Sequence, residues 1–320
     1  MKAINRLFLG CLVVFLTASC DDIIEKDITN DTVQLVSPID DAQIESNVVS
    51  FQWNNLEDAD KYRIQVYADN QIVALDSVVT ATHLTIPMSP GTYQWRVRGE
   101  NSAYVSSYSF PMSFSLIETT DLENQQVILS SPTAGLYTNN TNITCTWESL
   151  SAADDYTFEL VNVSEGGIVI HQEENIVGTS FLLTSTYLED DAQYQWKVMA
   201  VNSTGNTEFS SRTFYKDTVN PNVSTNSLPA DNSIQVAGTQ ISFGWSVPSD
   251  SGVVQAPLRY VIEFANDSAF SSIVLTSTSL STNSFQNIFS TAGTYYWRVR
   301  TTDMAGNQSG YSTAYKFIIN

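Results

Sequence analysis

One eight-residue stretch occurs twice in the chain with a single difference, as Gly91-Thr92-Tyr93-Gln94-Trp95-Arg96-Val97-Arg98 and as Gly293-Thr294-Tyr295-Tyr296-Trp297-Arg298-Val299-Arg300. A looser copy lies between them, Ala192-Gln193-Tyr194-Gln195-Trp196-Lys197-Val198. In all three copies Tyr, Trp and Val alternate with polar or basic residues, the period of two that is typical of a strand with one buried face. The sequence therefore predicts three related strands, each turning an aromatic face to a core.

Two further strands recur before this stretch. Each copy opens with a proline (Pro38, Pro132 and Pro229), and 15 or 16 residues later an alternating strand ends in tryptophan. These strands are predicted at residues 49–53, 143–147 and 241–245. Each is followed by a strand led by tyrosine, with its apolar residues on one face: Tyr62, Ile64 and Val66; Tyr156, Phe158 and Leu160; Tyr260, Ile262 and Phe264.

The end of each copy is also shared. Gly205-Asn206 and Gly306-Asn307 predict turns with positive φ. Each copy is then expected to close on an aromatic strand, with Phe110 and Phe114, Phe209 and Phe214, or Tyr315 and Phe317. Copies of roughly 95 residues, made of short alternating strands without a long 3.6-residue period, predict an all-β chain of three tandem antiparallel β-sandwiches.

The order of strand-end tryptophan, tyrosine strand and Tyr-x-Trp-x-Val strand resembles that of bacterial fibronectin type III-like modules, which are immunoglobulin-like β-sandwiches. The resemblance covers nearly all of residues 34–320. It implies three modules, at 34–118, 126–216 and 222–320, whose short linkers limit bending. Modules of this kind serve so many functions that the resemblance alone selects none of them.

The amino terminus carries a targeting signal. Lys2 and Arg6 precede an apolar run of about ten residues, which covers roughly half of a membrane span. The sequence Leu16-Thr17-Ala18-Ser19-Cys20 resembles the lipobox of bacterial lipoproteins, although Thr17 stands where an aliphatic residue is usual. The resemblance implies a lipoprotein signal peptide at 1–19 and lipidation of Cys20; an ordinary secretory signal is the alternative.

The residues after the signal bear on location. Residues 20–33 are expected to form an acidic tether, which begins Cys20-Asp21-Asp22-Ile23-Ile24-Glu25. This segment resembles the export signals of surface lipoproteins in some bacteria with two membranes. It implies a protein anchored in the outer membrane through lipid on Cys20 and exposed at the cell surface, with the periplasmic face as the alternative. The sequence identifies no protein or glycan partner.

Composition excludes several classes of function. The chain has 34 acidic and 14 basic residues, a net charge of −20, and loses two of the basic residues with the signal. Such a charge argues against nucleic acid or an anionic membrane surface as a partner. Cys11 leaves with the signal, Cys20 is assigned to lipid, and Cys145 takes the core position of Phe51 and Phe243. No disulfide is therefore expected.

Few residues could carry chemistry. His83 and His171 fall at strand surfaces in different modules, and no zinc, nucleophile or phosphate-binding motif is present, so we predict no catalytic residue, cofactor or metal. Calcium is the one ion that the composition favours, around Asp250 or around Asp303 and Asn307, although neither segment has the ligand density of a dedicated loop. Carboxylate pairs are predicted to be solvated loop charges: Asp58 and Asp60, Asp154 and Asp155, Glu173 and Glu174, Asp190 and Asp191.

Three functions remain open. The first is a non-enzymatic, lipid-anchored surface protein that serves as spacer, scaffold or adhesion module. The second is a glycan-binding lipoprotein of a nutrient-uptake system, which would bind through Tyr104, Tyr108 or Tyr311, because all six tryptophans are assigned to cores. The third is an accessory subunit of a surface enzyme or secretion complex. An enzyme in its own right is not expected. Four triplets resemble a bacterial O-glycosylation sequence, starting at Asp31, Asp76, Asp217 and Asp267.

Overall fold

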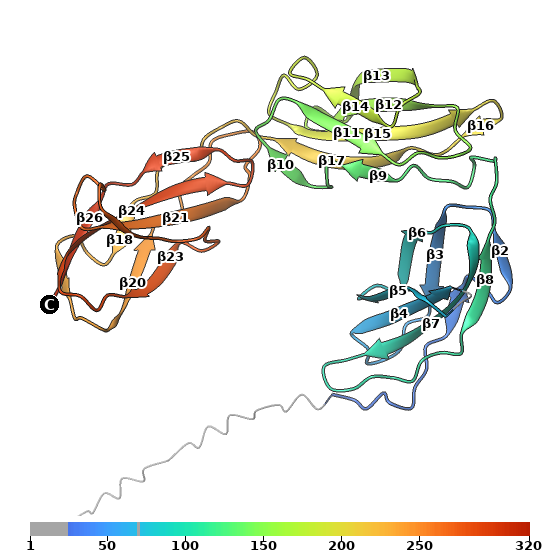
Figure 1. Cartoon of the computed structure of the whole chain (residues 1–320), viewed down its shortest axis with the longest axis horizontal. Coiled ribbons are helices and arrows are strands. Elements are labelled where there is room, and N and C mark those ends of the chain that lie inside the picture. The colour runs from blue at the N-terminus through green and yellow to red at the C-terminus, as the bar shows by residue number, and fades with distance from the viewer. Residues whose placement is uncertain (1–24, 69–70) are drawn as a thin grey trace, which may run out of the picture. The chain divides into compact units, whose positions relative to one another are not determined.

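The computed structural model describes residues 25–68 and 71–320, and within them it contains strands and no helix (Figure 1). The part of the chain that it describes therefore includes no helix that could cross a membrane. By its backbone contacts the chain divides into two compact units, one ending at Ser115 and the other reaching Asn320. The first unit holds one sandwich and the second holds two, so the predicted all-β fold class is confirmed.

The first sandwich is built from a three-stranded and a five-stranded sheet. In the smaller sheet the order is β1 (Leu35–Ser37), β3 (Val48–Trp53) and β6 (His83–Pro87). In the larger sheet the order is β2 (Ala42–Ile44), β8 (Met112–Leu116), β7 (Gly91–Glu100), β4 (Lys61–Ala68) and β5 (Val73–Val79).

The second sandwich repeats this plan. Its smaller sheet runs β14 (Ser180–Leu183), β11 (Ile143–Trp147) and β9 (Leu129–Ser131). Its larger sheet runs β10 (Leu136–Thr138), β17 (Ser210–Lys216), β15 (Gln193–Asn202), β12 (Asp155–Asn162) and β13 (Ile168–Ile176), with β16 (Gly205–Asn206) paired to β15.

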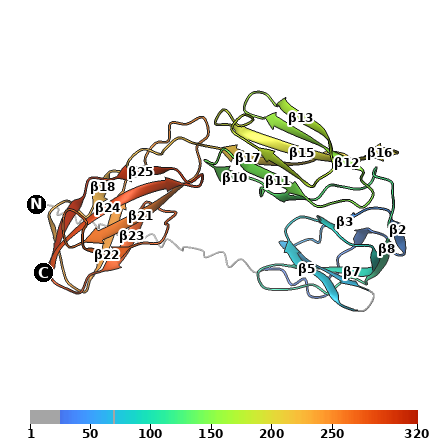
Figure 2. The ribbon, with the colours of Figure 1, turned by 45° about the horizontal axis from the view of Figure 1, so that its top comes forward.

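The third sandwich has the same strand order, and its two sheets are seen again in Figure 2. The smaller sheet is β18 (Asn226–Leu228), β20 (Gln240–Trp245) and β23 (Ser284–Ile288). The larger sheet is β19 (Ser233–Gln235), β26 (Tyr315–Ile319), β24 (Gly293–Asp303), β21 (Leu258–Ala265) and β22 (Ile273–Thr276), with β25 (Gln308–Tyr311) paired to β24.

The starts of the second and third sandwiches contain a parallel strand pair. The chain changes sheets at the repeated proline, whose peptide bond is cis in all three copies. Because it keeps its direction across this point, the next short strand lies parallel to the last strand of the sandwich: β10 pairs in parallel with β17, and β19 with β26. These two short parallel pairs lie at the edges of sheets whose other pairs are antiparallel, as predicted.

The core of each sandwich is made from the repeated aromatic positions. All six tryptophans are at most 3% exposed, so their predicted assignment to the cores is confirmed: Trp53, Trp95, Trp147, Trp196, Trp245 and Trp297. Phe51 lies with its ring centroid 5.1 Å from that of Trp95, and Phe243 lies 5.4 Å from Trp297. Cys145 occupies the equivalent core position and is fully buried, as predicted, and burial raises the pKa of its thiol.

Two aromatic residues and one glycine lie differently from the prediction. Phe110 is 94% exposed and precedes β8, because Pro111 has no N–H to donate to a sheet and the strand begins only after it. Phe209 is half-buried and precedes β17. Gly306 has the predicted positive φ, at 99°, whereas Gly205 lies in the short strand β16 and does not.

Candidate functional site

Three carboxylates converge in the second unit. Asp217 directly follows β17, Asp250 lies in the loop between β20 and β21, and Asp303 is the last residue of β24. One oxygen from each side chain lies within 4.8 Å of the others. Asp217 is fully buried, Asp303 is 5% exposed and Asp250 is half-buried. We call these three residues the acidic cluster.

Backbone amides fix two members of the acidic cluster. Asp217 accepts hydrogen bonds from the N–H groups of Val219 (3.1 Å) and Ala256 (3.0 Å), one on each carboxylate oxygen. Asp303 accepts two from Asn307, one from its backbone N–H and one from its side-chain amide, both at 2.8 Å. The positions of these two carboxylates are therefore set by the fold around them.

The third member is bound on one oxygen only. Asp250 Oδ1 accepts from the N–H of Gly252 at 3.2 Å. Its Oδ2 is shielded from solvent and has no hydrogen-bond partner among the described residues. A buried carboxylate oxygen without a donor is unfavourable, because it has lost its water without gaining a partner.

Among the residues that the structure describes, no lysine, arginine or histidine forms an ion pair with the acidic cluster. The adjacent Lys216 binds Asp191 instead, at 3.1 Å. Burial raises the pKa of Asp217, the Asp303 and Asp250 carboxylates raise it further, and the amide bonds from Ala256 and Val219 lower it in part. The donor set of carboxylate oxygens is the one that hard cations such as calcium prefer.

The sequence had placed two parts of this cluster but not the third. Asp250 and Asp303 with Asn307 were predicted as separate places for calcium, and the structure brings them together. Asp217 had been noted only as the start of a glycosylation-like triplet. Asp217 directly follows the last strand of the second sandwich, and the alternation of that strand continues through it. Lys216 and Thr218 on either side bind Asp191, whereas the Asp217 carboxylate accepts from the N–H of Ala256 in the third sandwich. This alternation is the feature of the sequence that could have identified Asp217.

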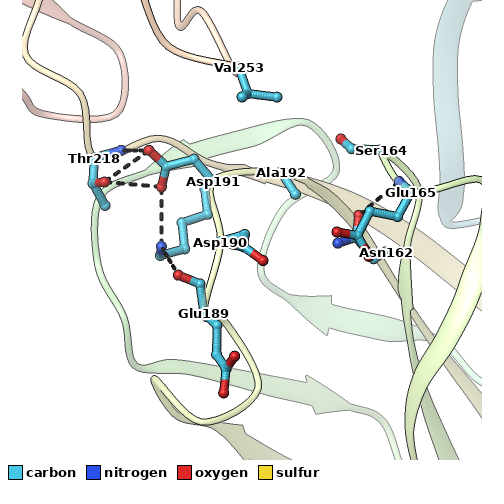
Figure 3. Close-up of a pocket in the computed structure, with 10 residues that line it drawn as sticks. Asn162, Ser164, Glu165, Glu189, Asp190, Asp191, Ala192, Thr218 and Val253 are labelled. Carbon is cyan, nitrogen blue, oxygen red and sulfur yellow. Dashed lines mark hydrogen bonds and ion pairs between the residues drawn. The ribbon is translucent and has the colours of Figure 1, made fainter.

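A polar cleft of about 490 Å³ lies beside the linker (Figure 3). On one side of it, Asp191 accepts hydrogen bonds from the side chains of Lys216 and Thr218 and from the Thr218 N–H. Asp191 is only 13% exposed at its side chain, so the prediction that it is a solvated loop charge was wrong. The cleft is lined mainly by acidic and polar residues: Asn162, Ser164, Glu165, Glu189, Asp190, Asp191, Ala192, Lys216, Thr218 and Val253.

Arginine side chains cover one ring face of two of the three tyrosines predicted to stack on glycans. In the first sandwich the guanidinium carbon of Arg96 lies 4.2 Å from the ring centroid of Tyr108, and in the third that of Arg298 lies 3.6 Å from Tyr311. Both tyrosines are half-buried, whereas Tyr104 is 37% exposed. The cationic groups therefore take one face of two of the three nominated rings.

These arginines belong to a repeated pair on the outer face of each larger sheet. In each sandwich, a basic residue on the strand with the core tryptophan lies directly opposite a glutamine or glutamate on the neighbouring strand. In the third, Glu263 Oε2 accepts from Arg298 at 2.8 and 3.0 Å. The basic residues that alternate with the core tryptophans thus tie neighbouring strands together. The pairs are Gln65 with Arg96, Glu159 with Lys197, and Glu263 with Arg298.

The other reactive side chains are placed apart. His83 is exposed at the start of β6, as predicted. His171, predicted at a strand surface, is half-buried. Its ring centroid lies 4.4 Å from that of Tyr187 and 5.4 Å from that of Phe181. Cys20, Asp21, Asp22, Ile23 and Ile24 lie outside the described residues, so the predicted lipidation site and the start of the tether have no structural account.

Comparison with known proteins shows likeness at the level of solved structures. No protein-family model matches the chain, and no curated protein does. The crystal structure of the chicken CNTN1 FN1-FN3 domains is similar, with a TM-score of 0.45 and 18% identity over 90% of this chain and 97% of that chain. A two-domain fibronectin type III segment from chicken tenascin has a TM-score of 0.22 and 14% identity over 57% of this chain and 97% of that one. The all-β fold is defined by the chain's own sheets, independently of these likenesses.

Proposed function

We propose that this chain is a non-enzymatic, lipid-anchored protein of the bacterial cell surface, whose sandwiches act as spacer, scaffold or adhesion modules. The anchor is lipid on Cys20, and the membrane is the outer membrane. One observation supports this proposal above the others. The side chains at the repeated positions fill the core of each sandwich, and all six tryptophans are at most 3% exposed. Such domains offer outer surfaces and linkers for function and keep their largest aromatic groups for stability.

The glycan-binding alternative is supported less well. Stacking on a sugar needs an open aromatic face, and in Tyr108 and Tyr311 one face already carries a guanidinium group. Tyr104 and Phe110 are the exposed aromatic residues of the first unit that remain for such a role. A glycan array with residues 21–320 tests this alternative directly, and reproducible binding that is lost in Phe110→Ala or Tyr104→Ala would favour it over a spacer.

The anchor makes the first prediction. Replacing Cys20 with alanine is expected to remove the acylated thiol, so that the protein moves from the membrane fraction to the soluble fraction and surface labelling of intact cells is lost. Membrane fractionation and labelling with an impermeant reagent measure both effects. Cys145→Ala is the matched control, because that cysteine is buried in the second sandwich and is expected to leave anchoring unchanged. Retention of Cys20→Ala in the membrane would contradict the lipoprotein assignment.

The absence of catalysis makes the second prediction. Residues 21–320 are expected to release no new reducing ends from a panel of polysaccharides and no product from ester or peptide substrates. Chromatography of the products after prolonged incubation gives the measurement. Turnover that copurifies with the folded chain and disappears on heat unfolding would overturn the non-enzymatic proposal.

A further inference from the structure

The acidic cluster of Asp217, Asp250 and Asp303 is not needed for a spacer role, which rests on the filled cores of the sandwiches. The fold holds three carboxylates together where solvent reaches them poorly, and within residues 25–68 and 71–320 no lysine or arginine forms an ion pair with any of them. Like charges at this separation repel one another, and burial strengthens the repulsion. The amide hydrogen bonds offset part of this repulsion, and protons or a bound cation would remove the rest.

A second observation points to a cation. Asp250 Oδ2 is shielded from solvent and receives no hydrogen bond from the part of the chain that the structure describes, although Oδ1 of the same carboxylate accepts one from the N–H of Gly252. The carboxylate is thus fixed in orientation with one oxygen left for a ligand. Because a ligand oxygen of each cluster member lies within 4.8 Å of the others, a single ion at a distance of about 2.3–2.6 Å can reach all three.

We propose that Asp217, Asp250 and Asp303 bind one calcium ion. Three carboxylates from separate segments supply oxygen ligands of the kind that calcium takes, and water fills the remaining positions of its coordination shell. Calcium fits better than magnesium, because backbone amides fix the directions of these carboxylates and magnesium demands near-ideal octahedral geometry.

The site lies where it fixes the linker between the second and third sandwiches. Asp217 belongs to that linker, while Asp250 and Asp303 belong to the third sandwich. The Asn307 side-chain amide already donates to the carbonyl of Asp217 at 2.8 Å, and its oxygen accepts from Asn139 of the second sandwich at 3.1 Å. A bound ion would join the linker, through Asp217, to the third sandwich, through Asp250 and Asp303, in addition to these hydrogen bonds. Calcium is therefore expected to stiffen the junction. This goes beyond the proposed function and does not depend on the lipid anchor.

Direct binding is measured by isothermal titration calorimetry on residues 21–320, which contain all three sandwiches, after removal of metal with a chelator. We expect one site with a Kd of about 10⁻⁴–10⁻³ M, as in extracellular calcium modules. Asp250→Asn is expected to weaken binding about tenfold or more, because affinity follows the number of charged ligands. Asp267→Asn is the matched control: Asp267 lies in the third sandwich but accepts only from its own loop, and binding is expected to stay unchanged.

Thermal unfolding gives a second readout that also shows that the variants fold. At about 10 mM calcium the transition of the third sandwich is expected to rise by about 3–8 °C over its value in chelator. In chelator, Asp250→Asn is expected to melt above the wild type, since it relieves the repulsion, and calcium is expected to raise its transition by less than it raises that of the wild type. The proposal is overturned if the wild type gives no calcium heat and melts alike in calcium and chelator. Unchanged binding in Asp250→Asn, or equal affinity for magnesium, would also overturn it.

Discussion

Replacing Trp95 with alanine is expected to lower the free energy of unfolding of the first sandwich by about 3–5 kcal/mol. The indole is fully buried against Phe51, and its Nε1–H donates to the carbonyl of Pro38 at 3.2 Å. Alanine therefore removes apolar contact, leaves a cavity and deprives that carbonyl of its donor. Because a single domain is stable by only about 5–15 kcal/mol, the loss is a large fraction of the total.

Native-state hydrogen exchange followed by mass spectrometry measures this effect one sandwich at a time. Protection is expected to fall in β3 and β7, while the strands of the second unit keep theirs, because Trp95 belongs to the core of the first unit. Gln94→Ala is the control: this neighbour on the same strand is exposed, and its loss is expected to change stability by no more than about 0.5 kcal/mol. Unchanged protection in Trp95→Ala would contradict its place in the core.

The strands of each sandwich could be predicted because their side chains alternate with a period of two. Along β7, Trp95 and Val97 are fully buried, Gln94 just before them is exposed, and Arg96 between them is half-buried. The same alternation can be read from the amino-acid sequence. A shift of one residue would turn the tryptophan and valine side chains to water and bring the glutamine into the core, so the pattern assigns each residue to a face. Repetition of the pattern in three copies then fixed the number of sandwiches.

The sheet changes at the prolines could not be predicted in the same way. Ser37–Pro38 and its counterparts show only that the chain turns there, and not which sheet receives the next strand. The choice depends on contacts with the last strand of the sandwich, which lies far away in sequence, as in the parallel pairing of Leu136 with Phe214. Non-local pairing of this kind leaves no local period to recognise.

The acidic cluster was predictable only in pieces. Asp303 and Asn307 follow a strand and resemble many Asp- and Asn-rich turns, and Asp250 lies in a long loop without period. What joins them is Asp217, whose carboxylate is held by the N–H of Ala256, a contact between the linker and that loop. The position of Asp191, which is bound and not solvated, has the same cause, since Lys216 at the end of β17 and Thr218 of the linker both bind its carboxylate.

A second large effect is expected at Glu100, the last residue of β7. This carboxylate is 7% exposed, and its Oε1 accepts from Arg63 at 3.1 Å and from Arg98 at 2.8 and 3.0 Å. Glu100→Gln keeps the shape but removes the charge, so Arg98 loses its charge-assisted partner and Arg63 keeps only its pair with Asp76, at 2.8 Å. We expect the first sandwich to lose about 2–3 kcal/mol of unfolding free energy at neutral pH.

The pH dependence of this loss separates charge from shape. Burial alone would raise the pKa of Glu100, but the hydrogen bonds from Arg98 and Arg63 outweigh it and hold the pKa below its usual 4.5. The folded carboxylate thus binds its proton more weakly than the unfolded one. Its stabilisation is fully present above about pH 4.5 and is lost as the pH falls through the folded pKa.

Urea unfolding of the wild type and Glu100→Gln, at neutral pH and at about pH 3, measures that difference. The two proteins are expected to differ in unfolding free energy at neutral pH and to converge on acidification, since protonation removes from the wild type the charge that the variant lacks. Glu57→Gln is the matched control, an exposed glutamate whose loss is expected to cost no more than about 0.5 kcal/mol. A gap between wild type and Glu100→Gln that stays constant with pH would mean that Glu100 acts by its shape, and that the two arginines find other partners.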